Sequence, residues 1–308
     1  MPMNAKQVRV VDAILTTIVR GYSNNAYIGN VLFPFVPAPS GGKVIKFGKE
    51  SFALYDTLRA RGADAKRISV GYEAEPFALD LHDLDAIVAE EDQRDAALTP
   101  NIDLAKEAVE TTMDAILLNL EYQQAKIARD PANYAANNKM ALTDPFGDID
   151  LRDMAATAKA AVRARIGKDP NVAVLGPQAR DAFKSHPMLT AALEKVGKIN
   201  VSDDMIREAL DIPRFVVGEA IYVENIDNKD APFTSIWGND IIYAYVPPTL
   251  SARQPAYGYT YRQPGRPLVR QPYQANSRRS TVYGVSDERS PQCTSDSAGF
   301  LISGVVTA

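Results

Sequence analysis

The longest uninterrupted pattern of apolar and polar positions lies between Thr99 and Asp130 and predicts an amphipathic helix of about 30 residues. Thr99 is expected to cap this helix, Pro100 suits its first turn, and Pro131 ends it. The apolar positions recur at spacings of three, four and seven residues: Ile102, Ala105, Val109, Met113, Ile116, Leu117, Leu120 and Ile127. At 1.5 Å per residue the helix is a rod of roughly 45 Å, which suits a scaffold for the rest of the chain.

Residues 1–40 begin with a short apolar pattern and then become an aromatic stretch interrupted by prolines. Pro34 and Pro37 exclude a helix there, and Phe33 and Phe35 require burial. An extended apolar segment without a fold of its own is expected to pack on other structure, either in the same chain or in a neighbouring one.

Residues 41–81 predict a long hairpin with strands at Val44–Gly48 and Ile68–Tyr72. Its tip is rich in basic residues and glycine and poor in residues that build a core, so we expect it to project from the body. Residues 82–98 are acidic, and we interpret them as a helix or turn that leads into the long helix.

The middle of the chain predicts helices alternating with short buried strands. The expected elements are a helix from Ile149 or Asp150 to Gly167, a strand at NVAVLG, a helix over 177–185, a turn at HPM, and a helix over 201–210 capped by Ser202 or Asp203. Strands follow at RFVVGEAIYVEN and IWGNDIIYAYVPP, then an alternating strand-rich stretch, and finally a buried strand at AGFLISGVV.

Composition indicates a globular chain, since 46% of its 308 residues are apolar. The single cysteine, Cys293, excludes a disulfide framework. No apolar run is long enough to cross a bilayer, so no membrane partner is expected.

Charge is distributed unevenly although the net charge is only −4. Residues 43–67 hold seven basic residues against three acids, whereas residues 73–121 hold fourteen acids against two bases. A basic block beside an acidic one suggests complementary surfaces within a subunit or between copies. For any single charge, ordinary solvated surface is the better interpretation.

The sequence contains no motif typical of a catalytic, phosphate-binding or metal-binding site. His82 and His186 cannot build a histidine-rich metal site, and GGKVIKFGKE departs from a phosphate loop because Glu50 replaces the residue that would hold magnesium. The acids around Glu90 lack the calcium-loop spacing. We therefore expect no catalytic residue, cofactor or metal, and a structural or binding role.

The order of these parts resembles a tailed-phage major capsid protein of the Hong Kong 97 type. The resemblance rests on a collinear series of phrases across nearly the whole chain: GGKVIKFGKESFALYDTLRARGADAKRI, YEAEPFALDLHDLDAIV, LAKEAVETTMDAILLNLEYQQAKIA, DPNVAVLGPQARDAFKSHP, VVGEAIYVEN, SIWGNDIIYAYVP and AYGYTYR. It implies an α+β fold with an N-terminal arm, an E-loop, a peripheral domain containing a spine helix, and an axial domain.

The resemblance also implies a division of the chain. The expected parts are the N-terminal arm (1–40), the E-loop hairpin (41–81), the peripheral domain (82–171) with its spine helix (99–130), the axial domain (172–250), and C-terminal strands returning to the peripheral domain (251–308). No cross-linking lysine and asparagine pair is found, so no covalent cross-link is expected. The arm starts almost at once, which suggests a separate scaffold or none.

The implied function is self-assembly into pentamers and hexamers of an icosahedral shell enclosing double-stranded DNA, in a virion assembled in the host cytoplasm. Partners would be other copies of the chain, a portal, and scaffold or decoration proteins. Expected contacts between subunits are Phe33, Phe35, Lys43, Lys46, Lys49, Arg59, Arg61, Lys66, Arg67, Glu90, Glu91 and Asp92. The alternatives are an encapsulin-like shell around protein cargo and a soluble enzyme with an unfamiliar site.

Overall fold

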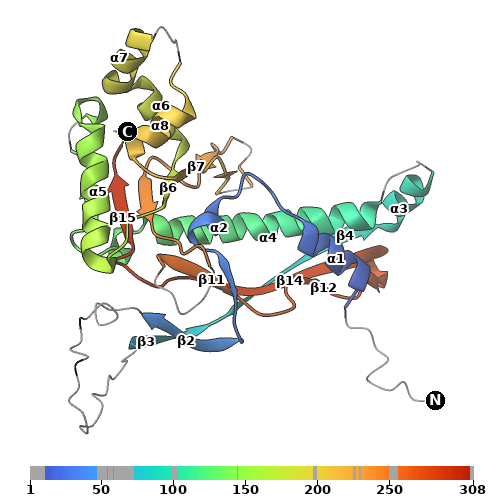
Figure 1. The fold of residues 1–308 in the computed structure, drawn as a ribbon. Coiled ribbons are helices and arrows are strands. Elements are labelled where there is room, and N and C mark those ends of the chain that lie inside the picture. Colours follow the sequence, from blue (N-terminus) through green and yellow to red (C-terminus); the bar gives the residue numbers. More distant parts are fainter. Residues whose placement is uncertain are drawn as a thin grey trace.

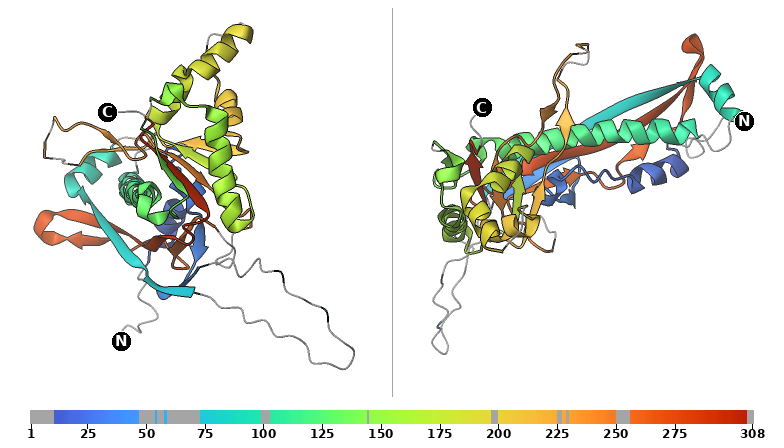
Figure 2. Two further views of the ribbon diagram at one scale, coloured as in Figure 1. Left: turned by 90° about the vertical axis from the view of Figure 1, so that its left-hand side faces the viewer. Right: turned by 90° about the horizontal axis from the view of Figure 1, so that it is seen from above.

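The computed structural model describes residues 11–46, 54, 58, 73–98, 103–143, 145–196, 200–224, 227–228, 230–249 and 256–305. One long helix, α4 (Leu104–Arg129), runs along a six-stranded sheet and reaches a five-stranded sheet at one end (Figure 1). Figure 2 shows the second sheet and its helices gathered at that end, with the six-stranded sheet extending away along α4.

The long helix confirms the predicted amphipathic rod in its described part. Asp103 caps it by accepting a hydrogen bond from the Lys106 amide at 3.1 Å, and helical residues end at Arg129, just before Pro131. The predicted cap at Thr99 lies outside the described residues. Val109, Met113, Ile116 and Leu120 are buried, as the spacing predicted, whereas Leu117 is only half-buried.

The six-stranded sheet is built around one long strand, β14. Its order is β1-β11-β14-β12, and both β13 and β4 also pair with β14. The strands are β1 (Phe35–Pro37), β4 (Asp80–Ala89), β11 (Gly258–Arg262), β12 (Leu268–Val269), β13 (Tyr273–Ala275) and β14 (Ser280–Cys293). The sheet therefore joins segments from the start, the middle and the end of the chain.

The helix or turn expected for 82–98 is wrong over its first half. Residues Asp80–Ala89 form β4, which pairs antiparallel with Ser280–Arg289 along ten residue pairs, and only Glu90–Ala97 is helical (α3). Leu81, Leu84 and Val88 have helix-like spacing, but pairing with a distant strand decides the conformation. The outward-facing acids Asp83 and Asp85 pair with Arg270.

The five-stranded sheet has the order β5-β15-β10-β6-β7 and a largely apolar core. Its strands are β5 (Lys139–Ala141), β6 (Val172–Leu175), β7 (Arg214–Val217), β10 (Ile241–Ala244) and β15 (Gly299–Ser303). Every residue of β6 and β10 is buried, which fits their continuous apolar sequences.

Four helices accompany this sheet: α5 (Leu151–Ile166), α6 (Pro177–Ser185), α7 (Pro187–Val196) and α8 (Asp203–Leu210). The caps predicted for two of them are confirmed, because Asp150 caps α5, left-handed Gly167 ends it, and Ser202 caps α8. The turn predicted at HPM is wrong, since Pro187 begins α7. Proline is compatible with the first position of a helix, where its missing N–H has no partner to lose.

The N-terminal segment lies along α4. It contains α1 (Ala13–Gly21) and α2 (Gly29–Leu32), after which β1 pairs parallel with β11. Two ribbons complete the fold, β2 (Gly41–Lys46) with β3 (Glu73–Ala78) and β8 (Ile221–Tyr222) with β9 (Thr234–Ser235). Three short 3-10 turns are η2 (Pro131–Asn133), η3 (Phe146–Asp148) and η4 (Asn276–Arg278).

The five-stranded sheet draws its elements from several of the sequential ranges expected for the domains, and the division of the chain into domains stays a prediction. Strand β5 and helix α5 precede residue 172 and β15 follows residue 250, yet all three belong with the five-stranded sheet. The chain enters this sheet, leaves it for β11–β14, and returns with β15, because pairing with β10 buries its apolar residues. The C-terminal strands are thus shared between both sheets.

Candidate assembly surfaces

The N-terminal segment is anchored to its own subunit by polar side chains of α4. Asp114 accepts hydrogen bonds from the Tyr22 hydroxyl at 3.0 Å, the Asn24 side-chain amide at 2.9 Å and the Tyr27 hydroxyl at 3.2 Å. Burial, together with the neighbouring Asp114 carboxylate, raises the pKa of Tyr27. Three donors from one loop therefore converge on a single carboxylate.

A second anchor is the buried carboxylate of Glu121. It accepts hydrogen bonds from the backbone amides of Ile28 at 2.9 Å and Gly29 at 2.8 Å and from the Trp237 indole at 2.6 Å. Burial raises the pKa of Glu121, although the three donors act in the opposite direction. A Cβ at Gly29 would lie 2.1 Å from the Gln124 side chain, so this close approach requires glycine.

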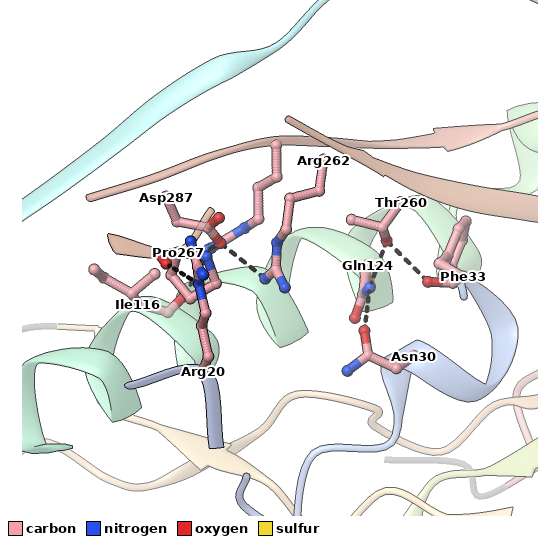
Figure 3. Close-up of polar contacts among 10 residues, drawn as sticks. Arg20, Asn30, Phe33, Ile116, Gln124, Thr260, Arg262, Pro267 and Asp287 are labelled. Atoms are coloured by element: carbon pink, nitrogen blue, oxygen red, sulfur yellow. Dashed lines mark hydrogen bonds and ion pairs between the residues drawn. The ribbon is translucent and has the colours of Figure 1, made fainter. Parts of the chain in front are cut away.

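A third anchor joins α4 to both β11 and the N-terminal segment (Figure 3). The Gln124 amide nitrogen donates to the Thr260 hydroxyl at 2.8 Å and to the Asn30 side-chain oxygen at 3.2 Å. The Thr260 hydroxyl in turn donates to the Phe33 carbonyl at 2.9 Å. This chain of hydrogen bonds fixes the entry of the N-terminal segment into β1.

Charged side chains are buried between the six-stranded sheet and α4. Asp287 accepts from Arg262 at 2.8 Å and from Arg289 at 2.7 Å through the same oxygen, and Arg289 also donates to the Ile116 carbonyl at 2.7 Å. Asp287 and Arg289 are fully buried, and the Arg262 side chain is 17% exposed. Burial lowers the pKa of both arginines, and the Asp287 carboxylate opposes that effect.

An acidic groove lies where β4, α3 and α4 meet. It has a volume of about 730 Å³, with Leu84, Ile87 and Leu104 among its apolar lining. Its acids are Asp85, Asp92, Asp95 and Glu107, and its lining contains no basic residue among those the structure describes. Leu84 and Ile87 remain about half exposed in the isolated subunit, at 46% and 51%.

The base of the hairpin is fixed to the six-stranded sheet by an aromatic stack. The ring of Phe77 in β3 lies 4.6 Å from that of Tyr261 in β11. The structure places β2 at Gly41–Lys46, which overlaps the predicted strand Val44–Gly48 only at residues 44–46, and β2 pairs with β3 from Glu73. The expected return strand at Ile68–Tyr72 lies outside the described residues.

The structure places the expected contact residues unequally. Phe33 is fully buried in its own subunit, with its ring 5.5 Å from that of Tyr257, so the expectation that it contacts a neighbour is corrected. Phe35 is half-buried beneath the Arg262 guanidinium. The other expected residues fall into three groups: Lys43 and Lys46 lie in β2, Glu90, Glu91 and Asp92 form the first turn of α3, and Lys49, Arg59, Arg61, Lys66 and Arg67 lie outside the described residues.

Sequence reasoning missed the buried polar anchors Glu121, Gln124, Asp287 and Arg289. A signal existed for two of them, because Glu121 and Gln124 continue the face of Leu117 and Leu120 at helical spacing. Asp287 and Arg289 lie on either side of Glu288 in a strand, and nothing local marks them as buried.

The described residues lack two kinds of feature. They contain no group of three or more histidine, cysteine, aspartate or glutamate side chains placed to hold a metal ion. Within the same part of the chain, every helix is too short or too polar to span a bilayer.

Comparison with known proteins gives matches over the full length of the chain. The chain is 36% identical over 316 residues to the major capsid protein of Burkholderia phage BcepMu, covering 97% of this chain and 98% of that protein. It is 26% identical over 245 residues to the major capsid protein of Pseudomonas phage JBD67, covering 76% and 77%. No family model matches the sequence.

Solved structures give the same picture. A phage-related protein from Bordetella bronchiseptica RB50 has a TM-score of 0.82 and 39% identity, covering 97% of this chain and 98% of that one. The satellite phage P4 procapsid has a TM-score of 0.51 at 12% identity, covering 97% and 93%, which indicates the fold alone.

Proposed function

This chain belongs to the family of phage major capsid proteins with the Hong Kong 97 fold, and from this membership we propose that its copies form the pentamers and hexamers of an icosahedral shell enclosing double-stranded DNA. As a major capsid protein it assembles with itself into the capsid shell of a virion. The observation that carries the proposal is the end-to-end match to a phage major capsid protein, 97% of one chain on 98% of the other.

Within this shell, we propose that the basic segment 43–67 of one subunit lies on the acidic groove of the next. The segment carries seven basic residues, and the groove carries four carboxylates above an apolar floor. Leu54 and Leu58 are exposed and four residues apart, so they provide apolar side chains to match that floor. Each exposed ion pair contributes at most about 1 kcal/mol, but a closed shell repeats every contact and holds each subunit through several neighbours.

Deleting residues 50–66 tests whether the hairpin serves assembly rather than folding. The described core lies outside this segment, so the variant is expected to fold and to yield few particles. Circular dichroism reports folding, and size-exclusion chromatography with negative-stain microscopy reports assembly. Particle yield equal to that of the unaltered chain contradicts the proposed placement of the hairpin.

A charge exchange tests the groove itself. Arg59→Glu with Arg61→Glu is expected to impair assembly, as is Asp92→Lys with Asp95→Lys, whereas all four changes together are expected to restore part of the particle yield. The control replaces two exposed bases on other helices, Arg152→Glu and Lys184→Glu, and is expected to leave assembly unchanged. Impairment without any rescue in the combined variant argues against this pairing.

The remaining partners are proposed by analogy with other members of the family. We expect a portal at one vertex, scaffold or decoration proteins where the phage supplies them, assembly in the host cytoplasm, and neither enzymatic activity nor covalent cross-linking. The alternative is an encapsulin-like shell around protein cargo, which the full-length match to phage capsid proteins disfavours. Nuclease-protected DNA in particles recovered from infected cells supports the phage shell, whereas a protein cargo without DNA supports the alternative.

A further inference from the structure

The buried charges behind the N-terminal segment do not balance. Arg262 and Arg289 share one carboxylate, Asp287, so the three buried groups carry a net charge of +1. Among the described residues, Asp287 is the only acid whose charge opposes the burial effect on either arginine. An uncompensated charge in a buried setting is costly, and it favours any anion that can reach it.

Arg262 is the member of this cluster that an anion can reach. Arg289 is fully buried and already donates to Asp287 and to the Ile116 carbonyl. Arg262 extends from β11 toward α4 (Figure 3), with one face of its guanidinium 3.8 Å from the Phe35 ring centroid. Its Nε is buried with no hydrogen-bond partner among the described residues, and its side chain lines a cavity of about 590 Å³.

Two more guanidinium groups line the same cavity from different parts of the chain. Arg20, at the end of α1, donates to the carbonyls of Pro267 and Gly265, which leave its charge unneutralised. Arg214, at the start of β7, is exposed and has no ion pair in the described structure. The cavity is therefore edged by three arginines that no single element of the fold would bring together.

Apart from one carboxylate, the remaining polar lining is uncharged. Amide side chains of Asn24, Asn30 and Gln124 and the hydroxyl of Ser23 also line the cavity. The one lining carboxylate, Glu121, is already taken up by three hydrogen bonds. Burial raises the pKa of Glu121 and so favours its neutral form, although the three donors act in the opposite direction.

We propose that this cavity, bounded by Arg20, Arg214 and Arg262, is a binding site for an oxyanion. Guanidinium groups recognise phosphate and carboxylate through paired N–H donors, and the volume falls within the range of roughly 300–1,000 Å³ that small-ligand sites occupy. Two sources present this chemistry in a capsid: free inorganic phosphate and a carboxylate side chain of a neighbouring subunit.

Calorimetric titration of the full chain with inorganic phosphate, at an ionic strength held constant with sodium chloride, tests the site. We expect saturable binding of one phosphate per chain. Arg20→Gln with Arg214→Gln should weaken it by about tenfold or more, because each change removes a charge-assisted donor. Arg278→Gln is the matched control, since Arg278 is exposed in η4 on β13–β14 and outside the cavity lining, and it should bind as the unaltered chain does.

Arg20 and Arg214, which are both exposed, are substituted in this test because Arg262→Gln would also disturb the buried cluster. Absence of saturable binding overturns the proposal, as does an equal affinity in the Arg20/Arg214 variant and the Arg278 control. Binding confined to assembled particles also overturns it, because neighbouring surfaces would then build the site. Binding to unassembled chains alone identifies a neighbour's carboxylate as the occupant in the shell, and binding to both forms identifies a free anion.

Discussion

The two sheets of this subunit are stabilised in different ways. The five-stranded sheet buries strands composed almost entirely of apolar residues, such as β6 and β10, beneath α5–α8. The six-stranded sheet meets α4 through a smaller apolar cluster and through buried polar groups, including Asp287, Arg289, Gln124 and Thr260.

The difference separates a core of apolar packing from a region held by specific polar partners. Apolar packing tolerates exchange among residues of similar size, whereas buried charges require a specific partner in a specific place. The six-stranded region also exposes Leu81, Leu84, Ile87 and Tyr273 in the isolated subunit. These exposed apolar side chains make the region a candidate for contact with neighbouring subunits.

Removing the carboxylate of Asp287 is expected to destabilise the six-stranded region more than any other change proposed below. Asp287→Ala leaves two buried arginines without a counter-charge and is expected to lower the free energy of unfolding by about 3–5 kcal/mol. Chemical denaturation of the unassembled chain measures the loss. A decrease below about 1 kcal/mol contradicts the assigned role of Asp287, and Asp83→Ala on the exposed face is the control.

Truncating a buried apolar side chain gives the corresponding measurement for the five-stranded sheet. Ile242 is buried in β10 at the centre of the five-stranded sheet, so Ile242→Ala is expected to cost about 2–4 kcal/mol. Ile242→Val removes one methylene and should cost about 1 kcal/mol. A loss of stability that grows with the number of atoms removed indicates apolar packing, whereas at Asp287 the carboxylate is either present or absent. Equal losses in Ile242→Ala and Ile242→Val would contradict this interpretation.

The contribution of Glu121 to stability is expected to depend on pH. Glu121→Gln places an amide donor among three donors and is expected to lower the free energy of unfolding by about 1–3 kcal/mol. Since the folded pKa of Glu121 is raised above its unfolded value, near 4.3, its contribution is fully present below that value and declines as pH rises through the folded pKa.

The stability difference between the unaltered chain and Glu121→Gln should therefore be larger near pH 4 than near pH 7. Denaturation of both chains across this range measures the trend. A difference that grows with rising pH contradicts the raised pKa. Glu91→Gln, in which the carboxylate is exposed, provides a control with no expected trend.

The exposed ion pairs of the six-stranded sheet give the smallest expected effect. Arg270 pairs with Asp83 and Asp85, and all three side chains are more than a third exposed. Arg270→Gln is expected to change the free energy of unfolding by at most about 1 kcal/mol, with less effect at high salt. Thermal denaturation at two salt concentrations measures it, and a loss of several kcal/mol would place this cluster with the buried charges.

The same contrast explains which features could be predicted from the sequence. Apolar runs predicted β6, β10 and β15, and local capping residues such as Asp150, Gly167 and Ser202 predicted the bounds of helices. Strand β4 was missed because its partner lies about 200 residues away in β14, and its helix-like leucine spacing pointed elsewhere. Asp287 and Arg289 were missed because their burial against α4 and their contacts with Arg262 and the Ile116 carbonyl arise only in the folded chain.

The hydrogen bond from Arg289 to the Ile116 carbonyl has a mechanical consequence. It joins the longest strand to the middle of the longest helix through a side chain that is itself held by Asp287. Sliding the strand along the helix would break this bond in a buried region, where an unpaired guanidinium is costly. The bond therefore opposes movement of the strand against the helix at this point.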